Sequence, residues 1–448
     1  MSSEWQTVAI GSLCLGIYDG PHATPKKTAE GPIFLGISSL NNGQLDLSAL
    51  EYLSEDDFIK WTKRVIPQAG DIVFSYETRL GQVAVIPAGL RCCLGRRMAL
   101  MRVDPAKATP DYLLYAYLSP DFQNVIRRRT IHGSTVDRIP LVEFGSFPIS
   151  VPSLGVQKEV VGVLRALDDR ITLLRETNAT LEAIAQALFK SWFVDFDPVR
   201  AKMEGRTPEG MDEATAALFP DGFEESELGL VPKAWKATNL ARLIKDYEGS
   251  IQTGPFGSQL HASDYLEAGT PVVMPKDIKN RRATTDSVAR IGAADVERLS
   301  RHKVLAGDIV FSRRGDVEKH ALITKREVGW ICGTGCLLLR PGKSWPSSTF
   351  LSMTLDAPKA RTWLVQHAVG ATMPNINTGI LGSVPLILPP DALLKEFENV
   401  ISVSEELRSQ NSSTSETLAT LRDTLLPRLI SGQLRLPEAQ AAAEEALA

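Results

Sequence analysis

The sequence predicts an α+β protein in which two tandem-repeated globular α/β bodies are separated by two long helices. The heptapeptide AGDIVFS occurs twice, at residues 69–75 and 306–312, which lie 237 positions apart. Short β-rich runs alternate with turn signals in both halves of the chain, and one long segment carries an unbroken heptad pattern. We therefore expect the two helices to form an antiparallel coiled coil, with a pseudo-two-fold axis relating the two copies.

The repeat extends beyond the heptapeptide. At the same offset Pro148 matches Pro385, whereas nearer the amino terminus Trp5 matches Trp235 at an offset of 230. Insertions have therefore accumulated in the first part of each copy. A period of this length is far above that of solenoid repeats, so it indicates a duplicated domain.

The bodies are expected to contain short strands and at least one helix. The β-rich runs are PIFLGIS, GDIVFSY and GQVAVIPA in the first copy and TPVVMPK, GDIVFSR and HALITK in the second. A helix is predicted over residues 110–129, because this stretch has an apolar face and ends in three arginines, which are favourable at a helix carboxyl end.

The heptad pattern predicts the first long helix. Its seam positions alternate spacings of four and three residues: Val160, Leu164, Leu167, Ile171, Leu174, Asn178, Leu181, Ala185, Leu188 and Trp192. Asn178 is the polar seam position, and a buried Asn at such a place fixes register and partner. Residues 393–429 are the expected partner helix. We expect a looser or interrupted centre there, because the stretch RSQNSSTSET is rich in poor helix formers.

These patterns divide the chain into six segments. The predicted segments are a first globular body at 1–153, a first long helix at 154–198, an acidic connector at 199–234, a second body at 235–391, a second long helix at 392–434, and an acidic tail at 435–448 that we expect to be disordered. Within the connector, DEATAALF is expected to form a short helix.

Composition favours a cytoplasmic protein without a membrane partner. The 448 residues are 44 % hydrophobic, but no apolar run approaches the roughly 18 residues needed to cross a bilayer. The start MSSEWQTVAIG lacks the basic and apolar regions of a signal peptide. The five cysteines are odd in number and form no C-x-x-C pair, so we expect neither a disulfide framework nor a zinc site.

The distribution of charge favours a polyanionic partner, although the net charge is −4. Residues 200–230 carry eight acidic and three basic side chains, and three more acidic residues follow Leu436. The repeated bodies are therefore net positive. Basic clusters recur in both bodies and are typical of phosphate contacts when they gather on one surface: Lys26-Lys27, Arg96-Arg97, Arg127-Arg128-Arg129, Arg281-Arg282 and Arg313-Arg314.

The catalytic motifs that would indicate an enzyme are missing. The tripeptide GKS at 342–344 has Leu337 where a phosphate-binding loop requires glycine. The sequence contains no G-x-G-x-x-G turn, no H-E-x-x-H, no Glu-x-Lys and no Asn-Pro-Pro-aromatic signature. We therefore predict no catalytic residue, no bound cofactor and no metal site.

Two turn-rich loops stand at matching places in the two copies. They are DGPHATPKK at 19–27 and TGPFGSQL at 253–260. Short polar side chains beside flexible backbone can hydrogen-bond base edges or phosphates. The alternative is that both are plain surface loops.

Together with the tandem bodies, two helical motifs carry a family resemblance. The segments LEAIAQALFKSWFVDFDPVRAKMEG at 181–205 and TLRDTLLPRLISGQL at 420–434 resemble the specificity subunit of type I restriction-modification enzymes. The loops DGPHATP and TGPFGSQL resemble the opening motifs of that family's target recognition domains. The resemblance implies that residues 1–153 and 235–391 are target recognition domains, each reading half of a bipartite, asymmetric site in double-stranded DNA. The helices would be the spacer that sets the gap.

The same resemblance implies partners that supply the missing chemistry. Two modification (methyltransferase) subunits would dock on the chain and bring S-adenosylmethionine, and restriction subunits would add translocation and cleavage that use ATP and Mg. The chain itself would bind none of these cofactors.

The resemblance also places candidate residues. Those expected near DNA are His22, Thr24, Lys26, Lys27, Arg128, Arg129, Ser134 and Thr135 in the first copy, and Gln259, Lys276, Arg281, Arg313, Arg314, Thr372 and Asn375 in the second. Those expected to contact the modification subunits are Trp192, Phe193, Phe196, Leu425 and Leu429. For the latter group the alternative is burial between the two helices of this same chain.

Two other functions remain open at this point. A fused modification enzyme would transfer methyl groups alone, and the missing methyltransferase motifs argue against it. A non-DNA-binding tandem structural scaffold protein would ignore DNA, and the basic clusters on both bodies argue against that.

Overall fold

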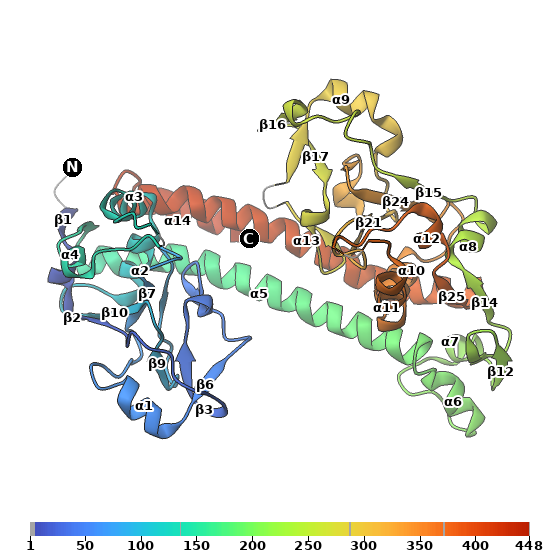
Figure 1. The fold of residues 1–448 in the computed structure, drawn as a ribbon, viewed down its shortest axis with the longest axis horizontal. Helices are drawn as coiled ribbons and strands as arrows, with labels where there is room; N and C mark the ends of the chain where they lie inside the picture. Colours follow the sequence, from blue (N-terminus) through green and yellow to red (C-terminus); the bar gives the residue numbers. More distant parts are fainter. Residues whose placement is uncertain (1–4, 135, 286–287, 371, 448) are drawn as a thin grey trace. The chain divides into compact units, whose positions relative to one another are not determined.

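The computed structural model describes residues 5–134, 136–285, 288–370 and 372–447 (Figure 1). The chain divides into two compact units, of which unit 1 comprises Met1–Arg175 with Ser413–Ala448 and unit 2 comprises Glu176–Ser412. Each unit contains one globular body and parts of the long helices α5 (Leu154–Phe193) and α13 (Asp391–Ile430). Within the described residues, no helix has the length and apolar character needed to cross a membrane.

The two bodies share one sheet topology, which confirms the predicted duplication. Each has a four-stranded antiparallel sheet, in the order β2-β10-β7-β8 in unit 1 and β15-β24-β21-β22 in unit 2. The repeated heptapeptide forms the inner strands β7 and β21, whose residues are all buried. The strands are β2 (Cys14–Asp19), β7 (Ile72–Ser75), β8 (Val83–Val85) and β10 (Met98–Val103), then β15 (Ser250–Thr253), β21 (Ile309–Ser312), β22 (His320–Leu322) and β24 (Cys336–Arg340).

A second sheet and several short pairings also recur in both bodies. The second sheet has the order β6-β3-β9 in unit 1 and β16-β20-β17-β23 in unit 2, and each contains one parallel pair. Its strands are β3 (Lys27–Leu35), β6 (Glu51–Leu53), β9 (Cys92–Leu94), β16 (Tyr265–Leu266), β17 (Thr270–Val273), β20 (Ala289–Ile291) and β23 (Ile331–Cys332). The short pairs are β1 (Gln6–Ala9) with β11 (Pro148–Val151), β14 (Lys236–Asn239) with β25 (Pro385–Leu388), β4 (Leu40–Asn41) with β5 (Gln44–Leu45), and β18 (Ile278–Lys279) with β19 (Arg282–Ala283).

The helices of the bodies follow the same duplication. The single helix predicted over 110–129 is two helices, because Pro120 lacks the N–H that a continuing helix needs and Ser119 caps the second helix instead. The shared helices are α2 (Pro110–Leu118), α3 (Pro120–Arg129) and α4 (Leu141–Phe144) in unit 1, and α10 (Ser348–Asp356), α11 (Pro358–His367) and α12 (Thr378–Gly382) in unit 2. The remaining short helices of the bodies are α1 (Glu55–Trp61), α8 (Leu240–Asp246) and α9 (Ala293–Arg298).

The predicted seam packs against α13 within each unit. In unit 1, Leu164 and Leu167 share a buried core with Leu425 and Leu429. In unit 2, Trp192 packs against Phe397, with ring centroids 5.8 Å apart and the ring planes tilted by 57°. In both units, residues late in one helix meet residues early in the other, so the pairing is antiparallel, as the sequence predicts.

The centre of α13 corrects the prediction of an interrupted helix, because the helix is continuous through RSQNSSTSET. Its hydroxyl groups donate to carbonyl groups one turn earlier, as Ser412 does to Arg408 at 2.8 Å and Thr417 to Ser413 at 3.1 Å. Asn178 of α5 also donates to Ser412 Oγ at 3.2 Å. Pairing with α5 thus outweighs the weak helix propensity of this stretch.

The acidic connector is folded onto unit 2. It contains α6 (Asp197–Met203), α7 (Glu213–Ala217) and the hairpin of β12 (Phe223–Ser226) and β13 (Gly229–Pro232). The predicted short helix is α7, and Asp212 caps it by accepting from the Thr215 amide at 2.7 Å. Phe219 packs edge-on against Trp192. The connector is therefore part of the core of unit 2.

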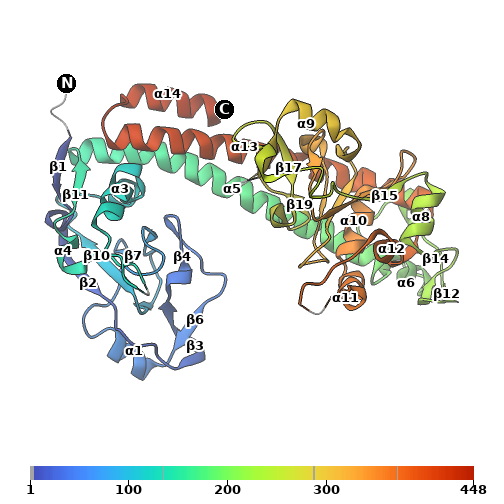
Figure 2. The same ribbon diagram turned by 45° about the horizontal axis from the view of Figure 1, so that its top comes forward.

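The carboxyl-terminal tail corrects the prediction of disorder. Residues Leu436–Leu447 form α14, which Figure 2 shows doubling back beside the end of α13. Gly432 has a φ of +73°, the left-handed conformation that permits this reversal. Ala439 and Ala443 are buried in the core of unit 1. The acidic composition of the tail suggested disorder, but one face of the helix is rich in alanine. This face supplies the apolar contact that orders the helix.

Deletion of residues 435–448 should destabilise unit 1. Loss of the buried α14 face should cost about 2 kcal/mol, which would lower the Tm of a unit of this size by roughly 5 °C. Differential scanning calorimetry of the full chain and the truncated chain measures this shift. Glu444→Ala, which changes an exposed residue of the same helix, is the control and should leave the Tm within about 1 °C. If truncation leaves the Tm unchanged, α14 does not stabilise unit 1, and the original prediction of a disordered tail would stand.

Candidate nucleic-acid interface

The two predicted loops leave the four-stranded sheets through the same backbone arrangement. The Gly20 amide donates to Met98 O at 2.8 Å, and the Gly254 amide donates to Cys336 O at 2.9 Å. A Cβ on either glycine would lie within 3.0 Å of a carbonyl oxygen. Only glycine fits this close approach. The glycine of the Gly-Pro pair at the start of each loop is therefore a structural requirement that both copies keep.

In unit 2 this loop borders a hollow in the surface. The hollow has a volume of about 430 Å³ and is lined by Gly254, Pro255, Phe256, Gly257, Pro275, Arg313, Arg314, Thr334 and Gly335. A neighbouring hollow shares Pro275 and Arg314 and adds Lys276, Lys279 and Lys319. We call the residues of both hollows, with the turn 372–375 described below, the second loop surface. The structure thus brings together three predicted residues, Lys276, Arg313 and Arg314, with two lysines.

The polar turn before the closing strand lies against the same arginines. The Ile376 amide donates to Arg313 O at 3.0 Å, and Arg314 and Asn375 form an isolated β-bridge. Thr372 is exposed at the turn. Gln259 behaves differently, because its Oε1 accepts from the Phe256 amide at 3.1 Å inside the loop. Gln259 therefore holds the loop backbone.

The first body presents a corresponding first loop surface, formed by residues 19–27, 76–79, 96–97, 131–134 and 136–138. Residues 76, 77, 78, 96, 97 and 138 stand 237 or 238 positions before residues 313, 314, 315, 334, 335 and 375. Burial, aided by the negative charges of Glu77 and Asp19, raises the pKa of Tyr76.

The predicted residues of the first body are exposed on its surface. His22 forms an ion pair with Asp19 at 3.2 Å, and Lys27 is paired with Glu51. Arg129, at the end of α3, lies over the Phe147 ring at 5.5 Å. The other described residues predicted here are also exposed: Thr24, Lys26, Arg128 and Ser134. Thr135 lies outside the described residues.

Sequence reasoning missed several residues of the first loop surface. Arg97 forms an ion pair with Glu77 at 3.0 Å. Arg138 closes the polar turn, since the Ile131 amide donates to Arg138 O at 2.9 Å. The doublet Arg96-Arg97 was visible as a basic cluster, and its offset of 238 from 334–335 was the signal that could have located it.

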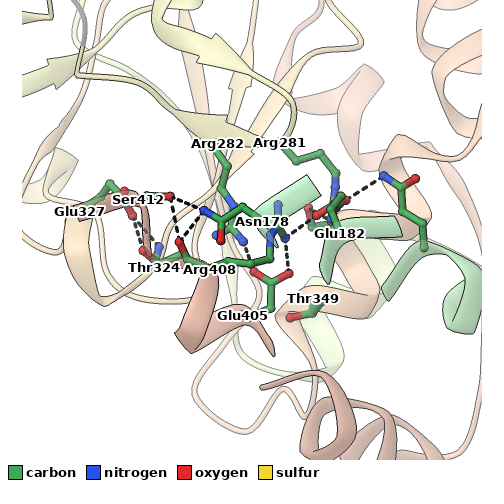
Figure 3. Close-up of polar contacts among 12 residues, drawn as sticks. Asn178, Glu182, Arg281, Arg282, Thr324, Glu327, Thr349, Glu405, Arg408 and Ser412 are labelled. Atoms are coloured by element: carbon green, nitrogen blue, oxygen red, sulfur yellow. Dashed lines mark hydrogen bonds and ion pairs between the residues drawn. The ribbon is translucent and has the colours of Figure 1, made fainter. Parts of the chain in front are cut away.

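Arg281 is buried within unit 2 and not exposed on the surface of the second body, which corrects the expectation that it is accessible to DNA. Its side chain is 7 % exposed, and it donates to Glu182 of α5 at 2.6 Å (Figure 3). It also donates to Ser352 of α10 at 3.2 Å. It occupies the two-residue turn between β18 and β19 with a φ of +59°. The equivalent residue in the β4–β5 turn is Gly43, with a φ of +95°. Arg281 therefore adopts the left-handed backbone conformation that glycine has in the first copy. In this conformation its guanidinium reaches Glu182 of α5.

The Arg281 contact belongs to a part-buried network of ion pairs. Arg408 of α13 contacts both Glu182 and Glu405, the latter at 2.6 Å, and Arg282 also pairs with Glu405 (Figure 3). Burial by itself raises the pKa of Glu182, but the guanidinium groups of Arg281 and Arg408 together outweigh it and hold that pKa below its ordinary value. The network joins the β18–β19 hairpin to both long helices within unit 2.

The aromatic residues predicted to contact partner subunits are buried within the chain. Phe193 packs edge-on against Phe350 and Phe397, with ring centroids 4.8 and 4.9 Å away. The whole predicted group is at most 9 % exposed: Trp192, Phe193, Phe196, Leu425 and Leu429. The structure therefore supports the alternative of burial in this same chain.

Comparisons with known proteins agree on one family. A family model described as the type I restriction modification DNA specificity domain matches residues 2–183. The type I restriction enzyme HindI specificity subunit of Haemophilus influenzae is 28 % identical over 377 residues, which cover 72 % of this chain and 77 % of that one. The MjaIX specificity subunit of Methanocaldococcus jannaschii is 22 % identical over 379 residues, covering 84 % and 80 %.

A solved structure shares the fold. The crystal structure of the type I restriction-modification system S subunit from M. genitalium aligns with a TM-score of 0.57 at 16 % identity. The alignment covers 96 % of this chain and 97 % of that one. In the part of the chain that the structure describes, no group of three or more His, Cys, Asp or Glu residues is arranged to hold a metal ion.

Glu182→Ala should destabilise unit 2 strongly. The substitution removes a carboxylate from between the buried guanidinium of Arg281 and the part-buried guanidinium of Arg408, which should cost about 3 kcal/mol. Urea unfolding followed by tryptophan fluorescence measures it, because five of the seven tryptophans lie in unit 2. Glu176→Ala, an exposed change on the same helix, should cost less than about 0.5 kcal/mol.

The same network predicts a pH dependence. Since the pKa of Glu182 is lower in the folded state, its contribution is present above its unfolded pKa of about 4.3 and is lost as the pH falls further. The wild type and Glu182→Ala should therefore converge in stability toward low pH. A difference that stays constant down to acidic pH would contradict the role of the carboxylate charge.

Proposed function

From its similarity to specificity subunits of type I restriction-modification enzymes, we propose that the chain is such a subunit and that it reads a bipartite, asymmetric site in double-stranded DNA, one half with each globular body. The chain supplies DNA sequence recognition and leaves catalysis to other subunits. We assign residues 1–153 and 235–391 as the two target recognition domains. Residues 154–198 and 392–434 are assigned as the spacer that sets the gap.

The observation that carries this proposal is the pair of loop surfaces. Their backbones follow the same hydrogen-bond pattern, as the amides of Gly20 and Gly254 illustrate, but their side chains differ. Arg313 and Arg314 stand where the first copy has Tyr76 and Glu77. Base edges are read by side chains presented from a fixed frame. The two loop surfaces share one backbone arrangement but carry different side chains, which suits a site whose two halves differ in sequence.

The helices suit the role of a spacer. Each of α5 and α13 has 40 residues, which at 1.5 Å per residue gives roughly 60 Å of helix. Asn178 and the part-buried ion pairs fix the register of the two helices within unit 2. A register that cannot slip is what a spacer needs to hold a constant gap.

Partner subunits complete the proposed enzyme. Two modification subunits would dock on this chain and use S-adenosylmethionine, and restriction subunits would use ATP and Mg. With the predicted aromatic group buried, exposed apolar side chains on the long helices are better candidates for docking. Ile184 on α5 and Val400 and Val403 on α13 are 56 %, 46 % and 73 % exposed.

The first test is a map of methylated adenines in a host with and without this gene, both strains carrying the modification partner. Deletion of the gene should abolish methylation at one bipartite motif. The motif would supply both half-sites and the gap. If the protein is made, its partner is active and no motif changes, the proposal fails and a structural scaffold becomes the better reading.

A second prediction concerns the gap. One heptad inserted in α5 between Leu167 and Asn178, with a matching heptad in α13 between Ser412 and Arg422, should change the preferred gap and leave both half-sites unchanged. The two insertions must be paired because the helices are antiparallel. Methylation mapping of the doubly extended chain reads the new gap.

A heptad inserted in only one helix is the control for the paired extension. It puts Asn178 out of register with its partners on α13, so the chain should lose stability and methylation at any gap. A paired extension that folds and keeps the original gap would show that the helices do not set the spacing.

A further inference from the structure

The first loop surface contains two non-glycine residues in the left-handed conformation. Thr78 has a φ of +70° and Arg97 a φ of +71°. Left-handed backbone is unfavourable for residues that carry a Cβ, and for a β-branched residue such as threonine it is a genuine outlier. Two such residues side by side indicate that something other than backbone preference keeps their side chains in place.

The second copy shows what the backbone alone requires. The equivalents of Thr78 and Arg97 are Gly315, with a φ of +76°, and Gly335, with a φ of +82°. The φ values agree closely, so the backbone arrangement shared by the two loop surfaces needs left-handed residues at both places. Glycine satisfies this need without strain in the second copy.

The hydrogen bonds of the frame are also the same. The carbonyl of Arg97 accepts from the residue 76 amide at 3.2 Å, and the carbonyl of Gly335 accepts from the residue 313 amide at 2.8 Å. The Thr78 amide donates to the residue 137 carbonyl at 3.4 Å, and the Gly315 amide donates to the residue 374 carbonyl at 2.9 Å. The bonds made by the glycines are the shorter in both comparisons. Glycine would therefore serve the first copy at least as well.

The two strained side chains contact each other. Arg97 Nη1 donates to Thr78 Oγ1 at 3.0 Å, and Arg97 Nε lies 3.0 Å from a carboxylate oxygen of Glu77. Thr78 is exposed, and the Arg97 side chain is 31 % exposed. A guanidinium carries five N–H donors, so one oriented by two contacts can still offer donors to a partner in solution.

We propose that Arg97 reads a base in the half-site of the first body, and that Thr78 and Glu77 position its guanidinium. This inference rests on the proposed function. Strain is kept at positions where a side chain is needed, and here a strain-free residue occupies the same frame in the other copy. Arginine recognises guanine O6 and N7 in the major groove by a bidentate contact. The target class is therefore a guanine-containing half-site, read through its major-groove edge.

The test exchanges the two residues for those of the second copy, as Thr78→Gly and Arg97→Gly in the full chain assembled with its modification partner. The probe is a duplex carrying the bipartite motif that methylation mapping returns for the wild type. Arg97→Gly should lose tenfold or more of the discrimination at one base pair of one half-site, on the order of a lost bidentate contact. Thr78→Gly should reduce the discrimination at the same base pair by a smaller factor. The other half-site should be unchanged.

Stability separates this role from a structural one. Because glycine relieves strain, both variants should have a Tm equal to or above that of the wild type. Arg91→Ala removes another exposed arginine of the same body, one paired with Glu55, and should leave both half-sites unchanged. Arg313→Ala or Arg314→Ala should alter only the other half-site.

Two results would overturn the inference. If Arg97→Gly is folded and keeps the wild-type preference in both half-sites, Arg97 does not read a base. If both glycine variants melt well below the wild type, the side chains serve stability. In either case the wild type would still read a bipartite motif, so the proposed function would stand. A wild-type complex that reads no bipartite motif would instead overturn the proposed function, and the inference with it.

Discussion

The polar contact in the middle of the helix pair is the constraint on which the rest of the architecture depends. Asn178 donates to Arg408 O at 3.1 Å and accepts from Asn411 Nδ2 at 3.0 Å. An apolar seam alone would tolerate a shift of one heptad, because leucines are interchangeable along it. The part-buried amide of Asn178 would lose these partners on such a shift, at a cost of about 1 kcal/mol. Asn178 therefore selects one register.

The register brings a carboxylate of α5 to the place where each body meets α13. In unit 2, Glu182 receives Arg281 from the body and Arg408 from α13. In unit 1, Asp168 plays the corresponding part, accepting from Tyr115 of α2 and from Arg422 of α13, both at 2.7 Å. One acidic group on α5 thus ties a body and the second helix together in each unit. The two copies reach this arrangement with different residues.

The sequence was sufficient for the features that depend on local pattern. The repeated strands, the seam from Val160 to Trp192 and the short helix α7 each follow from residues close together in the chain. The sequence was insufficient where the environment of a residue is set by a partner far away in the chain. Arg281 reads as a surface cation until Glu182, 99 positions away, is placed beside it. The order of α14 depends likewise on an apolar surface made by other segments.

The candidate site shows the same division between frame and side chain. The close approach of the backbone at Gly20 could be inferred from a repeated Gly-Pro pair. The left-handed backbone at Thr78 could not be inferred in this way, because the first copy has no glycine at that position. A side chain on an exposed loop can change with little effect on a buried sheet, so a duplicated frame can diverge in what it reads. Only where the frame demands left-handed backbone does a side chain cost stability, about 1 kcal/mol or more. That cost marks Thr78 and Arg97 among the many exposed polar residues of the first body.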